Sequence, residues 1–379
     1  MKFTEYQVKN IFRKEGIPIP EGKVAESVQE AVQIAEALGS EVVVKSQVQT
    51  GGRSKAGGIN FSTSLDEVRQ AATHLFDSEV KGEKVKHLLV EKKMPIQQEC
   101  YIGIMLNSDE KNTTLIFSQT GGVDIEETAR KNPDHIVKIP VDPLIGLRDF
   151  HLNRINRMAG YNPALTKSLK SIVIKLYHMY VTYDCLMLEI NPLAILKDQT
   201  WMALDGKLEI DDNARYRQQD LVKIWNKESE DPIERIGREA GFVVIKLHGD
   251  VSIISNGAGI AISTLDLLKK YDMGVANILD LSGGATAEKV MRAVEVVSQD
   301  SDVKAILFNI FGGITRCDEI AQGVTDALAQ SPLNMPVICR LDGTNRAEGI
   351  NILKKAGMAA ASDLEESVKQ VADILKVSS

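Results

Sequence analysis

Residues Lys45 to Gly58 combine positive charge with glycine, directly after a run of three valines. The stretch holds four glycines and the cations Lys45, Arg53 and Lys55. Glycine lets backbone N–H groups approach a ligand closely, and cations beside such a loop favour a polyanion such as phosphate. The glycine spacing matches neither a dinucleotide-binding fingerprint nor a P-loop. The loop is therefore a candidate phosphate site of another kind, or else a basic surface loop.

A second group of side chains carries oxygen atoms suited to a hard metal ion. Glu189 and Asn191 lie in a predicted strand over 187–193, and Asp205 lies in a predicted hairpin partner over 202–207. Magnesium takes one or two protein carboxylates and keeps waters and substrate phosphates as its other ligands. If Asn191 and Asp205 face the basic loop, they would form such a site. The alternative is two polar residues near a hairpin turn.

Two glutamates bracket a short bend between predicted strands. Glu91 ends the run 87–90, and Glu99 opens the run 100–105, which is expected to pair antiparallel with 115–118. These carboxylates suit hydrogen bonding to the ribose hydroxyls of a nucleotide. Simple exposure of these side chains to water would explain both glutamates equally well. The spacing of Glu91 and Glu99 does not decide between ribose binding and solvation.

The composition is that of an ordinary globular protein. The 379 residues predict two or three domains, and 44% hydrophobic and 26% charged residues suit large cores. A net charge of −7 argues against a general role in nucleic-acid binding. The four cysteines are scattered, which favours reduced thiols over disulfides or a zinc site. No apolar run is long enough to span a membrane and no signal peptide is evident, so we expect a cytoplasmic protein.

The pattern of secondary structure changes near the charged stretch 228–232, and we expect domains at 1–230 and 231–379. Downstream of it, strands and helices alternate in five βα units, which predicts a parallel sheet covered on both faces. The expected strands are 251–254, 275–281, 304–311, 335–341 and 357–361. The expected helices are 258–270, 286–298, 318–330, 346–356 and 364–376.

Glycine-containing turns follow four of these strands. They span 256–259, 282–286, 311–316 and 342–345. All lie at the carboxyl ends of predicted strands, where open α/β sheets bind ligands, and each leads into a helix N-terminus, which attracts anions. Helix capping by itself also favours small polar residues at such turns. Four turns at one edge nevertheless predict a binding edge.

The chain resembles, from end to end, the β subunits of the succinyl-CoA synthetase family, which are ATP-grasp proteins of the NDP-forming acyl-CoA ligase group. The resemblance rests on motifs in one shared order: Glu5–Gln7, Gly51–Gly58, Gly121–Glu126, Glu189–Leu193, Leu204–Leu208, Asn256–Gly259 and Asn309–Asp318. It implies an N-terminal ATP-grasp domain of two α+β subdomains, followed by a flavodoxin-like doubly wound domain.

The resemblance also implies roles for single residues. Nucleotide-binding positions of the family fall on Lys45, Gly52, Arg53, Ser54, Glu91, Met94 and Glu99. The magnesium ligands fall on Asn191 and Asp205, and Glu189 matches a glutamate that contacts a phosphohistidine. The carboxylic-acid site falls on Asn256, Gly313, Ile314 and Thr315.

The implied reaction joins succinate and CoA at the expense of ATP or GTP, through an acyl phosphate and a phosphohistidine. That histidine and the CoA site belong to a partner α subunit, in an αβ or α2β2 assembly. Consistent with this, none of the six histidines of this chain lies in a glycine-rich nucleophile loop.

Three positions bear on specificity. Serine at position 54 replaces a common glycine but keeps its backbone N–H, so nucleotide binding should survive. Thr315 stands where valine or methionine is frequent, which leaves malate or citrate open as the acid. Pro20 differs from guanine-selective relatives and favours adenine. A noncatalytic nucleotide-binding subunit is a further alternative, but it would require a disrupted metal site.

Overall fold

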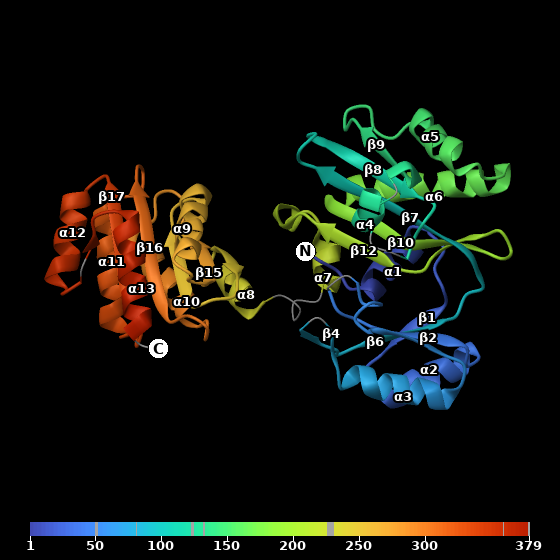
Figure 1. The fold of residues 1–379 in the computed structure, drawn as a ribbon, viewed down its shortest axis with the longest axis horizontal. Coiled ribbons are helices and arrows are strands. Elements are labelled where there is room, and N and C mark those ends of the chain that lie inside the picture. Colours follow the sequence, from blue (N-terminus) through green and yellow to red (C-terminus); the bar gives the residue numbers. More distant parts are fainter. Residues whose placement is uncertain are drawn as a thin grey trace. The chain divides into compact units, whose positions relative to one another are not determined.

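The computed structural model describes residues 1–49, 52–80, 82–122, 125–131, 133–225, 231–358 and 360–377. The chain divides into two compact units, Met1–Asn226 and Lys227–Ser379 (Figure 1). The domain boundary expected at 230/231 adjoins the segment 226–230, which lies outside the described residues.

The first unit contains a four-stranded antiparallel sheet in the order β1-β6-β2-β3. Its strands are β1 (Gly22–Ala25), β6 (Leu88–Lys92), β2 (Val42–Ser46) and β3 (Ile59–Ser62). Helices α2 (Val28–Leu38) and α3 (Leu65–Phe76) share a core with the sheet, formed on its side by Val42, Val44, Leu88 and Val90. Because side chains alternate along a strand, Lys45 and Glu91 belong to the opposite face. A small hairpin of β4 (Glu79–Val80) and β5 (Glu83–Lys84) follows α3.

The same unit contains a six-stranded antiparallel sheet in the order β11-β10-β7-β8-β9, with β12 also paired to β10. Its strands are β7 (Ile96–Asn107), β8 (Asn112–Ser118), β9 (Ile136–Val141), β10 (Cys185–Leu196), β11 (Trp201–Ala203) and β12 (Gly206–Ile210). The expected pairing of β7 with β8, and of 187–193 with the 202–207 segment, is confirmed. The sequence analysis did not predict strand β9.

Helices cover the larger sheet and build its core. They include α1 (Glu5–Lys14), α5 (Asp149–Ala159) and the long α6 (Pro163–Thr182), all of which contribute buried apolar side chains to one cluster (Figure 1). From α1 this cluster takes Val8, Ile11 and Phe12. The shorter elements of the unit are α4 (Ile125–Lys131), α7 (Gln219–Ile224), and the 3-10 turns Pro133–His135 and Asp212–Ala214.

The second unit is a six-stranded sheet in the order β13-β15-β14-β16-β17-β18. Its strands are β13 (Val243–Lys246), β14 (Val251–Ser255), β15 (Val275–Asp280), β16 (Ala305–Gly312), β17 (Val337–Gly343) and β18 (Ala360–Ala361). The five strands from β14 on are parallel. Their order, second-first-third-fourth-fifth, is that of flavodoxin-like folds and confirms the expected fold class. The edge strand β13 is antiparallel and was missed by the sequence analysis.

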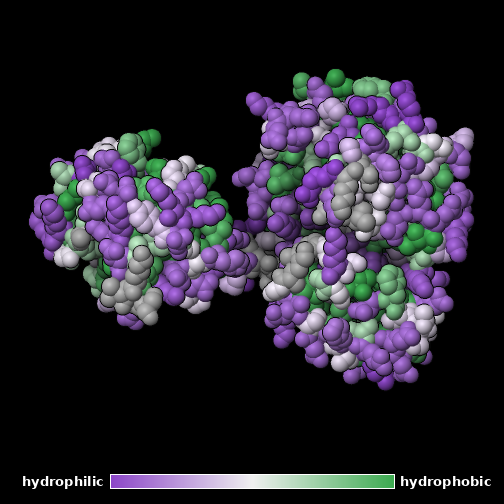
Figure 2. All heavy atoms as spheres, in the orientation of Figure 1, coloured by the Kyte–Doolittle hydropathy of each residue, from purple (hydrophilic) through white to green (hydrophobic). Residues whose placement is uncertain are grey.

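Helices cover both faces of this sheet. One face packs against α8 (Pro232–Glu239), α10 (Ala287–Ser298), α11 (Cys317–Gln330) and α12 (Arg346–Lys355). The other packs against α9 (Ala258–Lys270) and α13 (Leu364–Val377). In both units the face seen in Figure 2 is mostly hydrophilic, with small separate hydrophobic patches. Across the described part of the chain, no helix has the length and apolar character needed to cross a membrane.

Candidate functional site

The basic loop and the β10–β12 region meet in the first unit. Arg53 Nη2 lies 2.7 Å from Asp205 Oδ2, and Arg53 Nη1 donates to the carbonyl of Ser46 at 2.8 Å. Lys45 Nζ donates to the carbonyl of Leu204 at 2.7 Å. The structure therefore brings together two predicted phosphate-binding cations and one predicted metal ligand, from segments about 150 residues apart.

Asn191 and Asp205 come from neighbouring chain segments. Strand β10 pairs with β11 at Leu193 and with β12 at Ile190, and between these points the amide of Leu204 donates to the carbonyl of Pro192 at 3.0 Å. Asn191 Oδ1 accepts the N–H of Gly122 at 2.8 Å. This hydrogen bond also brings the turn after β8 to the same place.

This donor set fits magnesium. Asp205 Oδ1 accepts the N–H of Gly206 at 2.7 Å, and the Asp205 side chain keeps 27% of its surface exposed. The described residues include no cluster of three or more His, Cys, Asp or Glu side chains arranged to hold a metal. One carboxylate and one amide oxygen leave most of the coordination sphere for water and phosphate oxygens, as magnesium requires.

The sequence analysis missed two charged residues of this cluster, Glu5 and Lys9 of α1. Glu5 Oε1 accepts a hydrogen bond from Lys45 Nζ at 2.8 Å and forms an ion pair with Lys9 Nζ at 2.8 Å, and Glu5 Oε2 lies 2.7 Å from Arg53 Nη2. Lys9 Nζ also lies 2.6 and 2.5 Å from the two carboxylate oxygens of Glu91. Two signals were available: Glu5 stands in the shared motif Glu5–Gln7, and the four-residue spacing places both residues on one helix face.

Six charged side chains thus form one buried network of three acids and three cations: Glu5, Glu91, Asp205, Lys9, Lys45 and Arg53. All except Asp205 are at least nine-tenths buried. A buried charge is costly unless it is paired, and the network pairs every member. Because acids and cations are equal in number, the network is electrically balanced without any ligand.

Burial and pairing act in opposite directions on the pKa values of this network. Burial by itself would raise the pKa of Glu5, but the charges of Lys45, Lys9 and Arg53 hold it well below its usual value. For Asp205, burial prevails over the neighbouring cations and raises the pKa. Burial would lower the pKa of Lys45, yet Glu5, Glu91 and Asp205 raise it, so this lysine stays charged.

Of the other predicted nucleotide residues, Glu91 is a member of the network, Met94 and Glu99 lie just before and within β7, and Gly52 and Ser54 lie in the basic loop. Glu91 is 2% exposed, so simple solvation does not explain it. Met94 lies half-buried between β6 and β7, and half-buried Glu99 lies against Gly122, where a Cβ would come within 2.2 Å of Glu99 Oε2. Gly52 and Ser54 are exposed in the basic loop, and Gly52 has a φ of +75°, which favours glycine.

Glu189 lies on β10, two residues before Asn191. It accepts a hydrogen bond from Tyr101 Oη at 2.9 Å and stands opposite Lys207 of β12 in the strand register. Burial raises the pKa of its carboxyl group, against the opposing effects of Tyr101 and Lys207.

In the second unit, side chains and backbone groups join the turns at the carboxyl edge of the sheet. Asn256 exchanges two hydrogen bonds with the backbone of Phe311, at 2.8 and 3.0 Å. These turns follow β14 and β16, between which the strand order reverses, and flavodoxin-like folds bind ligands at that point. Asn256 therefore lies where the fold favours a ligand.

Two threonines extend this connection to the other turns. Thr315 Oγ1 accepts the N–H of Gly284 at 3.0 Å, and Thr344 Oγ1 donates to the carbonyl of Gly313 at 2.9 Å. Thr315 is buried, whereas the neighbouring Ile314 is 87% exposed. The predicted substrate residues Asn256, Gly313, Ile314 and Thr315 thus lie along a single edge, where an exposed apolar side chain stands beside backbone N–H groups.

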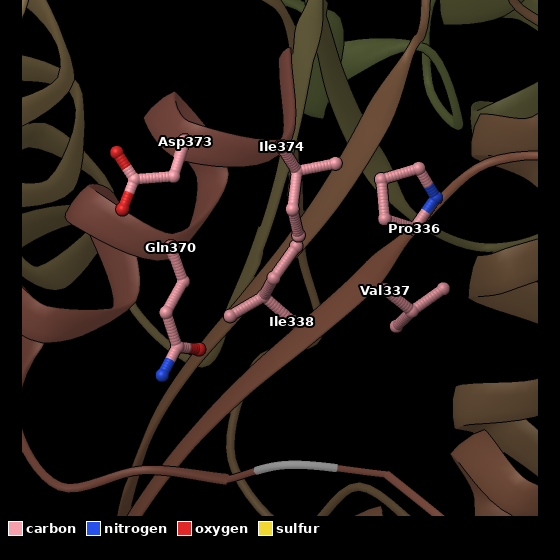
Figure 3. A pocket seen from close by; sticks show the side chains of 6 residues that line it. All are labelled: Pro336, Val337, Ile338, Gln370, Asp373 and Ile374. Atoms are coloured by element: carbon pink, nitrogen blue, oxygen red, sulfur yellow. The ribbon is translucent and has the colours of Figure 1, made fainter. Parts of the chain in front are cut away.

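A separate hollow of about 320 Å³ lies between β17 and α13. Figure 3 shows Ile338 and Ile374 extending toward each other across it, with Gln370 and Asp373 on the helix side. Pro336 and Val337 mark the amino-terminal end of β17, so this hollow is not at the carboxyl edge. We therefore do not assign it to the substrate site.

Comparison with known proteins gives matches to two family models and to full-length relatives. Residues 2–195 match the model of the ATP-grasp domain, and residues 254–374 match that of the CoA-ligase domain. Subunit beta of succinate–CoA ligase [ADP-forming] from Bacillus subtilis (strain 168) is 40% identical, over 99% of this chain and 100% of that protein. The protein of the same name from Desulfatibacillum aliphaticivorans is 39% identical, over 99% and 100%.

Among solved structures, the chain is similar to ATP citrate lyase from Methanothrix soehngenii in complex with citrate and coenzyme A. The match has a TM-score of 0.74 and covers 98% of each chain. At 17% sequence identity, it supports the shared fold alone.

Proposed function

Because this chain belongs to the family of succinate–CoA ligase β subunits, we propose that it provides the nucleotide site of a two-chain acid–thiol ligase. The complete reaction joins succinate and CoA with cleavage of a nucleoside triphosphate to a diphosphate and phosphate, and it is reversible. The names of the full-length relatives specify ADP formation, which favours ATP over GTP as the nucleotide.

The observation that carries this proposal is the convergence of Lys45, Arg53 and Asp205. Arg53 Nη2 lies 2.7 Å from the Asp205 carboxylate, and Lys45 Nζ lies 2.7 Å from the backbone of the adjacent Leu204. Two buried cations beside a metal-binding carboxylate form the arrangement that phosphoryl transfer needs, because that reaction depends on positioning and on neutralising charge.

The assigned residues bind different parts of the Mg-nucleotide. Lys45 and Arg53 contact phosphate oxygens, and the backbone of Gly52 and Ser54 closes around them. Glu91, Met94 and Glu99 hold the ribose and base. Asn191 and Asp205 would hold Mg2+, which neutralises charge on the phosphates when bound. Glu189, whose carboxyl pKa is raised by burial, receives the phosphohistidine.

The second unit takes the carboxylic acid at its turn edge. Asn256, Gly313, Ile314 and Thr315 line that site, where backbone N–H groups at helix N-termini suit a carboxylate. A partner α subunit brings the phosphohistidine and the CoA site, in an αβ or α2β2 assembly. All four cysteines are free and buried, which suits a reducing compartment, and we place the enzyme in the cytoplasm.

Titration of the isolated chain with Mg-ATP and Mg-GTP tests the nucleotide assignment directly. We expect binding of the nucleotide without formation of acyl-CoA and without stable phosphorylation of a histidine. Addition of the α subunit should then give CoA-dependent release of phosphate. Failure of the wild-type chain to bind either Mg-nucleotide would overturn the proposal, and so would histidine autophosphorylation by this chain alone.

The identity of the acid is tested separately. Steady-state assays of the assembled enzyme with succinate, malate and citrate should give the highest kcat/KM with succinate. A preference for malate or citrate would keep the nucleotide assignment but change the substrate. A complex that binds the nucleotide and turns over none of the three would support the noncatalytic alternative.

A further inference from the structure

In the ligand-free network, three protein oxygens lie within 3.0 Å of the Lys45 ammonium group. Lys45 Nζ lies 2.8 Å from Glu5 Oε1, 2.7 Å from the carbonyl of Leu204 and 3.0 Å from Glu91 Oε2. An ammonium group has three N–H donors. Two of them are used on Glu5 and on the Leu204 carbonyl, so a phosphate oxygen would compete with the nearby Glu91 carboxylate for Lys45.

Glu91 is the partner best placed to give way. Its contact with Lys45 is the longest of the three, and both of its carboxylate oxygens lie close to Lys9 Nζ, at 2.6 and 2.5 Å. Glu5, by contrast, also neutralises Arg53, with Glu5 Oε2 lying 2.7 Å from Arg53 Nη2. If Lys45 leaves Glu91, the carboxylate still has a bidentate partner.

Without Lys9, the same exchange would be costly. Glu91 and Lys9 are each 2% exposed, although both border a hollow of about 240 Å³, so water would replace a lost partner only in part. A buried carboxylate without a cation is strongly destabilised, and it would hold Lys45 as its only remaining counter-charge. Lys9 is anchored for this role because its helix inserts Val8, Ile11 and Phe12 into the core of the larger sheet.

We propose that Lys9 is a positioning residue of the nucleotide site: it retains the Glu91 carboxylate while Lys45 turns from that carboxylate to a phosphate oxygen. This inference rests on the proposed function and names a residue that neither the motifs nor the metal set identified. Lys9 touches neither nucleotide nor metal in this scheme. Its effect reaches the phosphate only through Glu91 and Lys45.

The test measures binding of Mg2+-tripolyphosphate and Mg-ATP to the full-length chain by calorimetry. Lys9→Met should weaken both ligands at least about tenfold, because Lys45 stays on Glu91. Glu91→Gln should bind tripolyphosphate at least as tightly as wild type, because no carboxylate competes for Lys45. For tripolyphosphate, which lacks the ribose assigned to Glu91, the double variant Lys9→Met/Glu91→Gln should recover to within about threefold of wild type, since it leaves no unpaired acid.

A matched control is Lys246→Met in the second unit, where Lys246 Nζ pairs with Asp300 and Asp302 at 2.8 and 2.7 Å. This variant loses an ion-paired lysine of similar geometry and should bind tripolyphosphate as wild type does. If Lys9 only stabilised the fold, the double variant Lys9→Met/Glu91→Gln should bind tripolyphosphate more weakly than Lys9→Met does.

The inference is overturned if Lys9→Met binds within about twofold of wild type, or if the double variant fails to recover. If Lys9→Met does not fold, Glu91→Gln still tests the inference. Weaker tripolyphosphate binding by Glu91→Gln than by wild type would also overturn it. If the wild-type chain binds no Mg-ATP, the proposed function fails as well. Wild-type binding with an unaffected Lys9→Met removes the inference alone.

Discussion

Arg53 and Asp205 form an ion pair in the ligand-free chain, with Nη2 and Oδ2 2.7 Å apart. Arg53 is assigned to bind phosphate and Asp205 to bind the metal. In the ligand-free chain, Arg53 therefore occupies the position proposed for the metal, and Asp205 occupies that proposed for the phosphate. Binding of a metal–phosphate complex between them would replace one ion pair by two favourable contacts. The two assignments are therefore coupled, and loss of either partner should affect both ligands.

The first prediction concerns Asp205→Asn. The amide keeps an oxygen to accept the N–H of Gly206, so the local turn should persist. Loss of the charge weakens the metal site, and the Mg2+ concentration for half-maximal nucleotide binding should rise at least about tenfold, or roughly 1.4 kcal/mol. Asp184→Asn is the control, since Asp184 is also a partly exposed partner of an arginine, Arg217, at 2.7 Å. An unchanged Mg2+ requirement in Asp205→Asn would refute the metal assignment.

The second prediction concerns Gly122→Ala. Gly122 has a φ of +69°, and an added Cβ would lie 2.2 Å from Glu99 Oε2. Alanine should displace the Glu99 side chain and the N–H that Asn191 accepts, which should raise the Kd of Mg-ATP several-fold.

Gly160→Ala separates this effect from backbone strain. Gly160 has a similar φ of +63° at the end of α5, and no atom lies within 4 Å of an added Cβ. Both variants should lose roughly 1 kcal/mol of stability from left-handed backbone, and Gly122→Ala alone should weaken binding. Equal Kd values for the two variants would argue that Glu99 does not contribute.

The third prediction concerns Thr315→Val at the turn edge of the second unit. Valine removes the oxygen that accepts the N–H of Gly284 at 3.0 Å. Loss of this hydrogen bond should cost about 1 kcal/mol and loosen the turn 282–285, which should raise the KM for the acid without lowering kcat. Thr325→Val, which removes a hydroxyl that bonds only locally to Gln322 in α11, is the control. A changed KM in the control, or none in Thr315→Val, would contradict the acid site.

The fourth prediction is a pH dependence of the second unit. Burial by itself would raise the pKa of Asp300, but hydrogen bonds from Lys246 and Asn277 lower it below its usual value. A carboxyl group with a depressed folded-state pKa stabilises the fold above its unfolded pKa, and this contribution is lost as pH falls through the folded value. The unit should therefore lose stability as pH falls below about 4.

Asp300→Asn should remove roughly 2 kcal/mol at pH 7 and flatten that acid dependence, because the amide does not titrate. Asp302→Asn is the control: its side chain is 55% exposed and pairs with the same Lys246, so it should cost under about 1 kcal/mol. Both tryptophans, Trp201 and Trp225, lie in the first unit, so their fluorescence would not report this change. Hydrogen exchange of peptides from β13 and β15 is the suitable measurement, and identical exchange in the two variants would refute the assignment.

Much of the second unit could be predicted from the sequence because its signals are local. Its parallel strands and five of its helices follow continuous apolar runs and helical periodicity, and their observed bounds differ from the expected ones by few residues. The edge strand β13 escaped notice because it is four residues long and its partner, β15, comes about 30 residues later. A short strand with a distant partner carries little signal of its own.

From residue type and near-neighbour spacing, the sequence by itself determined the parallel sheet of the second unit and the basic glycine loop. The ATP-grasp fold and most candidate site residues were predicted from its resemblance to a family. Only the tertiary structure decided that Glu5 and Lys9 join Lys45, Arg53, Glu91 and Asp205 in one buried network. The physical reason is that ion pairing depends on distance in space. No local sequence pattern shows that a helix at the start of the chain packs in the core of one sheet and places its charged residues against a strand of another sheet.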